Sequence, residues 1–120
     1  MADELKVTLK VVVESDDISV DDILIEDLLI DVAGTDFYHA TKQCAVTETS
    51  FDAITAGGYL LIANLDDTNF IQIKAELNEA FLVRVNPGEF AFFRTPPLAT
   101  RMRMFADTAG CLVEYWYWAA

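Results

Sequence analysis

The sequence of 120 residues predicts an all-β protein, an antiparallel two-sheet β-sandwich of jelly-roll type with eight to nine short strands. Three observations support this fold class. Apolar side chains recur at every second position, which is the period of a strand with one buried face. Clusters of turn-forming residues separate these short apolar runs. No alternation of strands with helical patterns is visible, so we expect mainly antiparallel sheets.

Length and composition indicate a single domain that covers residues 1–120. This length is a common size for one domain, and 53% of the residues are hydrophobic. No apolar run approaches the roughly 20 residues that a membrane-spanning helix needs. The acidic N-terminus, Met1–Glu4, lacks the basic and apolar regions of a signal peptide. We therefore expect a soluble protein that is made in a cytoplasm and has no membrane partner.

The N-terminal third contains two predicted strands. Residues 5–13 place an apolar side chain at every odd position. Residues 21–33 are ambiguous, because Asp21 could cap a helix with a partial apolar face. The strand alternative, which the neighbouring strands favour, needs a β-bulge near Glu26–Asp27. Such a bulge would point four apolar side chains inward: Ile23, Ile25, Leu28 and Ile30.

The other predicted strands cover residues 38–49, 59–63, 70–74, 80–85, 90–94, 101–106 and 111–118. The run at 59–63 is wholly apolar, as expected at the centre of a sheet, whereas 38–49 has mixed polarity and suits an edge or an interface. A short helical turn is expected at 51–54. Asx residues predict a turn at 64–69, and proline with glycine predicts another at 86–89.

The net charge of −12 is unevenly distributed. Residues 1–36 contain 11 acidic and 2 basic residues, a net charge of −9, whereas residues 37–120 contain 9 and 6, a net charge of −3. An acidic surface repels phosphate backbones, so we expect no nucleic-acid partner. It favours solubility or docking onto a basic partner.

The sequence offers few residues for catalysis or metal binding. His39 is the only histidine, so neither a base–nucleophile pair nor a histidine-rich metal site is indicated. Asp66 and Asp67 could offer oxygens to Ca²⁺, but their spacing differs from the twelve-residue calcium loop and favours a turn that satisfies its own backbone. Cys44 and Cys111 are expected to be buried free thiols rather than a disulfide, because no secretion signal is present. We predict no enzymatic activity, cofactor or metal.

Aromatic residues cluster in the last predicted strand. In a strand, Tyr115 and Tyr117 share one face, and Trp116 and Trp118 share the other. One face must pack in the core, and the other is either covered or exposed as a protein interface or sugar-stacking platform. Adjacent phenylalanines in 90–94 raise the same question. The candidate interface residues are therefore Phe92, Phe93, Tyr115, Trp116, Tyr117 and Trp118.

Three segments carry a resemblance to a known group of proteins. They are Gly58–Ile73, Phe81–Arg94 and Phe105–Tyr115. Together they resemble small virion proteins of tailed bacteriophages, in which an N-L-D-x-T-N turn, a P/A-G-E turn and an A-D-T-A turn follow one another. The resemblance covers residues 58–118, about half of the chain, and its motifs are turn motifs.

The resemblance implies a β-sandwich that assembles on a phage particle after synthesis in the host bacterial cytoplasm. The first expectation is a capsid decoration (cement) protein that binds and stabilises the head shell as a homo-oligomer, with a trimer favoured. Its partners would be itself and capsid or tail proteins, and a neck, tail or fibre component is the alternative. Outside this group, the residues also allow a carbohydrate-binding module that stacks sugars on Trp116, Trp118 or Tyr59. A cupin-like enzyme is disfavoured by the single histidine.

Overall fold

The computed structural model describes residues 4–12, 23–31, 37–51, 57–74, 80–95 and 102–119. Its regular secondary structure is entirely β-strand, with ten strands that pair antiparallel in three sheets. The prediction of an all-β, antiparallel protein is therefore confirmed. Within these ranges there is no helix with the length and apolarity needed to cross a membrane. The sequence predicts one domain, and the chain divides into two compact units, Met1–Ala33 and Gly34–Ala120.

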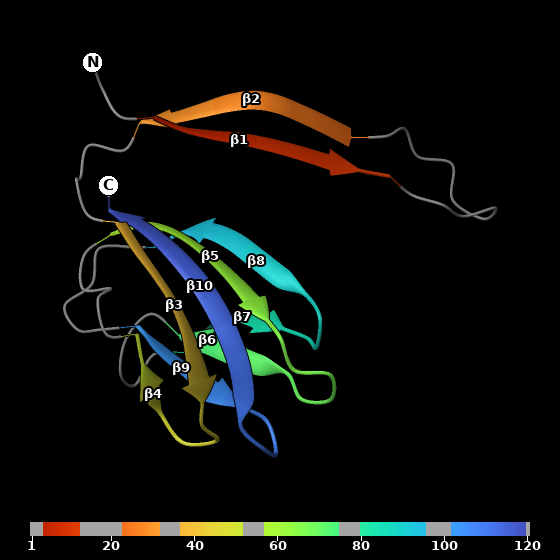
Figure 1. The fold of residues 1–120 in the computed structure, drawn as a ribbon, viewed down its shortest axis with the longest axis vertical. Helices are drawn as coiled ribbons and strands as arrows, with labels where there is room; N and C mark the ends of the chain where they lie inside the picture. Colours follow the sequence, from red (N-terminus) through yellow and green to blue (C-terminus); the bar gives the residue numbers. More distant parts are fainter. Residues whose placement is uncertain are drawn as a thin grey trace. The chain divides into compact units, whose positions relative to one another are not determined.

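The first unit, which we call the hairpin unit, contains strands β1 (Glu4–Val11) and β2 (Ile23–Asp31) in antiparallel pairing (Figure 1). The register shifts in the middle, where Glu26 and Asp27 both oppose Thr8. Asp27 has a φ of 52°, a left-handed conformation that aspartate tolerates better than most residues. Its backbone N–H donates to Thr8 Oγ1 at 3.3 Å. The strand interpretation and the predicted bulge are both confirmed. The expected inward placement is wrong for Ile25 and Leu28, which are 41% and 49% exposed, because the two-stranded sheet leaves these side chains accessible.

The second unit, which we call the main unit, contains two four-stranded sheets (Figure 1). The first has the order β3 (Phe37–Cys44), β10 (Cys111–Ala119), β5 (Gly58–Asn64) and β8 (Phe90–Arg94). The second has the order β4 (Thr49–Ser50), β9 (Arg103–Ala106), β6 (Ile71–Lys74) and β7 (Phe81–Val85). The pairs are nested: β6 pairs with β7, β5 with β8, β4 with β9 and β3 with β10.

Buried side chains of both four-stranded sheets belong to one hydrophobic core. Alternate positions of β5 and β10 are buried, as the period of a strand requires. Leu60 and Tyr115 from one sheet and Ile73 and Met104 from the other have no exposed surface. The ring of Phe51 meets the ring of Tyr115 edge to face at 5.0 Å, an arrangement that aromatic pairs prefer.

The predicted strands of the main unit match the observed ones with small shifts at their ends. The apolar run at 59–63 lies in β5, between β10 and β8, which confirms its central position. The predicted strand at 38–49 is two strands, β3 and β4, and β3 lies at the edge of its sheet as expected. The predicted helical turn at 51–54 falls outside the described residues, apart from Phe51.

Candidate functional site

The outward side of the β3-β10-β5-β8 sheet carries six aromatic residues that are not part of the core. Opposed residues of paired strands point to the same face, so the outward positions form rows across the sheet. The first row consists of Phe37, Trp118, Tyr59 and Arg94. The second outward row consists of His39, Trp116, Leu61 and Phe92. Adding Phe90 from the third row, we define the aromatic face as Phe37, Tyr59, Phe90, Phe92, Trp116 and Trp118.

Ring contacts join most of the aromatic face into a continuous chain. Ring centroids lie 5.6 Å apart for Phe37 and Trp118, 6.5 Å for Trp118 and Phe92, and 6.2 Å for Phe92 and Tyr59. The guanidinium of Arg94 lies 5.6 Å from the Tyr59 ring centroid, within the range of a cation–π contact. These contacts hold the rings in place before any partner arrives, which lowers the entropy cost of binding.

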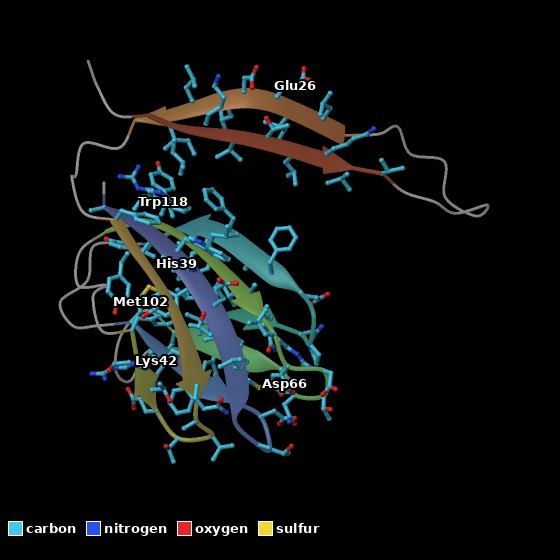
Figure 2. All side chains as sticks on the ribbon, in the orientation of Figure 1. Glu26, His39, Lys42, Asp66, Met102 and Trp118 are labelled. Atoms are coloured by element: carbon cyan, nitrogen blue, oxygen red, sulfur yellow. The ribbon has the colours of Figure 1, made fainter. Side chains whose placement is uncertain are left out.

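His39 lies next to the aromatic face and orders one of its rings. Its imidazole stacks on Trp116 with centroids 4.9 Å apart and an interplanar angle of 8°. A hydrogen bond of 2.8 Å joins His39 Nε2 to Glu114 Oε2. In Figure 2, His39 and Trp118 lie toward one end of the main unit, and Asp66 lies in a loop toward the other end. The stacking contact with His39, which is itself held by Glu114, therefore fixes the position of the Trp116 ring on the outward side of the sheet.

The six predicted interface residues divide between the two sides of the sheet. Tyr115 and Tyr117 are buried in the core, at 0% and 3% exposure, and Phe93 packs against that core. The three others lie on the outward side: Phe92, Trp116 and Trp118. The predicted separation of tyrosines from tryptophans in the last strand is confirmed, and the tyrosines are the inward set.

Sequence reasoning missed the two most exposed rings of the aromatic face. Phe37 is 56% exposed and Phe90 is 66% exposed. Phe90 lies two residues before Phe92, so the period of two places both on the same side of the strand. The alternation therefore predicts that Phe90 belongs to the same face as Phe92. Phe37 is the first residue of β3, one position before the predicted strand at 38–49, and it joins the face through its pairing with Trp118.

The turns that carry the phage resemblance are linked to one another by hydrogen bonds. Buried Asn64 donates through Nδ2 to the carbonyls of Asn69 and Val85 at 2.9 and 3.1 Å, and its Oδ1 accepts from the Asp66 N–H at 3.0 Å. Its backbone carbonyl accepts from the Gly88 N–H at 3.1 Å. One side chain therefore ties the turn at 64–69 to the strand that leads into the turn at 86–89.

The third of these turns joins the same network. Thr108 Oγ1 donates to Asn69 Oδ1 at 2.7 Å, and the Asp107 N–H donates to the Phe70 carbonyl at 3.0 Å. Gly88 has a φ of 74°, which accounts for glycine in the turn at 86–89. The resembling residues are therefore explained by turn chemistry and by the contacts between turns.

Asp66 uses its carboxylate on its own backbone. Its Oδ2 accepts from the N–H groups of Asn69 and Thr68 at 2.6 and 3.0 Å. These two hydrogen bonds hold the pKa of the Asp66 carboxyl below its ordinary value, since they favour the charged form. The preference for a self-satisfied turn is confirmed. The part of the chain that the structure describes contains no group of three or more His, Cys, Asp or Glu side chains placed to hold a metal ion.

Comparison with known proteins identifies no relative of this chain: no family model, curated protein or solved structure matches it.

Proposed function

We propose that this protein is a non-enzymatic structural protein of a bacteriophage virion, a capsid decoration protein that binds the head shell as a homo-oligomer. The observation that carries the proposal is the aromatic face, which is an ordered row of rings on the outward side of a sheet. Large exposed apolar patches on a soluble protein mark interaction surfaces. Aromatic side chains are also enriched where interfaces hold most of their binding energy.

The strand order supports a jelly-roll architecture for the main unit. Its four nested pairs are what results when one long antiparallel ribbon is rolled into two sheets. Jelly rolls of eight strands occur in viral capsid domains, lectin domains and cupins. A cupin site needs several metal-binding histidines, and His39 is the only one in this chain. The residues of this chain are therefore compatible with a viral capsid role or a sugar-binding role on this architecture.

The linked turns supply the second line of support. All three turns that resemble phage virion proteins belong to one hydrogen-bonded network at the loops of the main unit. The three turns therefore form one connected structural feature of this chain. The resemblance of their residues to virion proteins is the ground for proposing the virion class.

Binding to empty capsids and native mass test the proposal together. We expect the purified chain to be oligomeric and to sediment with empty capsids of its phage. Phe90→Ser should weaken capsid binding, because it removes the most exposed ring of the aromatic face. Leu112→Ser is the matched control. Leu112 is 43% exposed on β10 of the same sheet, but it is not one of the residues of the aromatic face. A monomer without affinity for capsid or tail components would refute the proposal.

A carbohydrate-binding module is the second candidate, and one observation favours it. Tyr59, Trp116 and Trp118, the three rings expected to stack on sugars, lie on the same outward surface. Exposed tyrosine and tryptophan rings offer flat apolar surfaces on which the apolar faces of sugars can stack. Tryptophan fluorescence titration with polysaccharides distinguishes this candidate. Saturable shifts would support it, and unchanged emission with every polysaccharide would count against it.

A further inference from the structure

A carboxylate lies among the rings of the aromatic face. The third outward row of the sheet consists of Thr41, Glu114, Ala63 and Phe90. Glu114 therefore points to the same side as Trp116, two residues later in β10, and shares its row with Phe90. The three outward rows, as far as the structure describes them, contain no other acidic residue. A partner that covers the rings of this face must also meet the Glu114 carboxylate.

His39 supplies a group that can neutralise this carboxylate. Its Nε2 lies 2.8 Å from Glu114 Oε2, and its ring stacks on Trp116 with an interplanar angle of 8°. The side chains of His39 and Glu114 are 44% and 29% exposed, so protons from the solvent reach the pair. Histidine is the side chain whose charge ordinarily changes between about pH 5 and 8. The pair is therefore net negative when His39 is neutral, and it has no net charge when His39 is protonated.

The other charged residues near His39 point elsewhere. Lys42 is the nearest charged residue on the same strand, but it lies at an inward position, opposite the buried Val113. Arg94 lies on β8 at the far end of the first outward row. Charged residues of the second four-stranded sheet are separated from His39 by the core. Among the residues with described side chains on this face, Glu114 is therefore the charged group in contact with His39.

The cost of covering the aromatic face depends on the charge of this pair. A charge that loses its water without an opposite charge costs more than a paired one. With His39 neutral, a partner that lies on the rings takes water from a carboxylate that has only a hydrogen bond in return. With His39 protonated, a positive charge lies 2.8 Å from the carboxylate, and the pair as a whole is neutral. The protonated state therefore binds an apolar surface better.

Protonation of His39 also strengthens the stack on Trp116. A cation over an indole ring is attracted by the ring quadrupole, and tryptophan is the best of the aromatic side chains for this contact. The centroid distance of 4.9 Å lies within the range of about 6 Å over which the attraction acts. One proton therefore neutralises Glu114 and holds the Trp116 ring in place, which lowers the entropy cost of binding.

We propose that His39 and Glu114 form a proton-linked switch in the aromatic face, so that binding of an apolar partner takes up a proton and strengthens as the pH falls from about 8 to about 5.5. This inference rests on the proposed function, in which the aromatic face binds the head shell. Proton and partner each raise the affinity for the other, because linkage is reciprocal. The part of the head shell that meets Glu114 is uncharged and apolar, since a basic side chain there would neutralise the carboxylate at any pH.

The test measures retention of the full chain on an uncharged phenyl-substituted resin at constant ionic strength. The resin is an apolar partner that does not depend on a capsid. The unmodified chain should bind at least about fivefold more tightly at pH 5.5 than at pH 8. His39→Gln should bind equally weakly at both pH values, because its amide gains no charge. Glu114→Gln should bind tightly at pH 8 and more weakly at pH 5.5, since protonated His39 then has no opposite charge beside it.

Asp67→Asn is the matched control for the loss of one negative charge. Asp67 is exposed in the turn at 64–69, and its neighbour Asp66 lies toward the other end of the main unit from His39 (Figure 2). The asparagine Oδ1 can still accept from Thr68 Oγ1, as Asp67 does at 2.9 Å. This variant should retain the full pH dependence. The proposal is overturned if His39→Gln also retains it, or if Glu114→Gln binds no more tightly than Asp67→Asn at pH 8.

Sedimentation with empty capsids at the same pH values separates the switch from the proposed function. A pH effect on the resin that disappears in His39→Gln supports the switch even if no capsid binds. Equal retention of the unmodified chain on the resin at both pH values, together with equal capsid binding, refutes the switch and leaves the role on the head shell in place.

Discussion

Cys44 and Cys111 lie directly opposite each other on strands β3 and β10, although 67 positions separate them in the sequence. Both are free thiols without exposed surface. Burial raises the pKa of the Cys44 thiol to about 12, and the neighbouring Cys111 contributes to the rise. Burial also raises the pKa of Cys111, to which Asp66 and Asp107 add. The pair ties the edge strand of the sheet to its neighbour through a small apolar contact.

We predict that both thiols resist alkylation in the folded protein. The thiolate is the reactive form, and burial removes both access and ionisation. Iodoacetamide at pH 8 should modify the folded chain at least about tenfold more slowly than the chain in guanidinium, as measured by mass spectrometry. Cys44→Ala and Cys111→Ala assign the two sites. Rapid modification of either thiol under native conditions would contradict the buried placement.

The same thiols predict a loss of stability at alkaline pH. The folded pKa of Cys44 is raised above its ordinary value of 9.0, so the folded state retains a proton that the unfolded state releases. This contribution to stability is fully present below pH 9.0 and declines as the pH rises toward the folded pKa of about 12. Denaturant unfolding between pH 8 and 11 should show a smaller decline for Cys44→Ala than for the unmodified chain. Equal declines would contradict this assignment.

Asn64→Asp should destabilise the main unit by about 3 kcal/mol, because it replaces a buried donor with an oxygen that faces two carbonyls. The acceptor contact to the Asp66 N–H would survive, so the loss combines the two donated hydrogen bonds with the cost of a buried negative charge. Asn86→Asp is the control. Its Oδ1 accepts from Arg84 Nε in an exposed turn, and this contact needs only an oxygen. Urea unfolding curves measure both, and a control as damaging as the test would contradict the role of Asn64.

The Asp66 turn should lose its stabilising effect in acid. The folded pKa of Asp66 lies below its ordinary value of 3.8, so ionised Asp66 stabilises the folded state. This contribution is present above pH 3.8 and disappears as the pH falls through the lower folded pKa. The difference in unfolding free energy between the unmodified chain and Asp66→Asn should therefore shrink between pH 5 and pH 2. A difference that is constant over this range would argue against the carboxylate as the cause.

Two phenylalanines of β8 should respond differently to truncation. Phe93→Ala should lower the free energy of unfolding by about 3 kcal/mol, because Phe93 packs against the core. Phe90→Ala should change it by less than about 0.5 kcal/mol, since the ring is 66% exposed. Thermal unfolding followed by circular dichroism compares them. A large loss for Phe90→Ala would mean that its ring supports the fold rather than a partner.

Local patterns in the sequence sufficed for several elements of the fold. The alternation at 5–13 and the restart of alternation at Glu26–Asp27 predict two strands and the bulge between their halves. The Asx residues at 64–69 and Pro87 with Gly88 predict both turns. These features depend on the period of a strand and on the backbone preferences of single residues, so neighbours in the sequence determine them.

The sequence by itself also determined that tyrosines and tryptophans of the last strand point to opposite sides, because successive residues of a strand alternate. Only the tertiary structure decided that Tyr115 and Tyr117 are inward, since that choice depends on which side the second sheet covers. The same holds for the neighbours of Trp118, which are Phe37 on one strand and Tyr59 on another. Such rows form through pairings between distant segments, and no local period specifies the order of strands in a sheet.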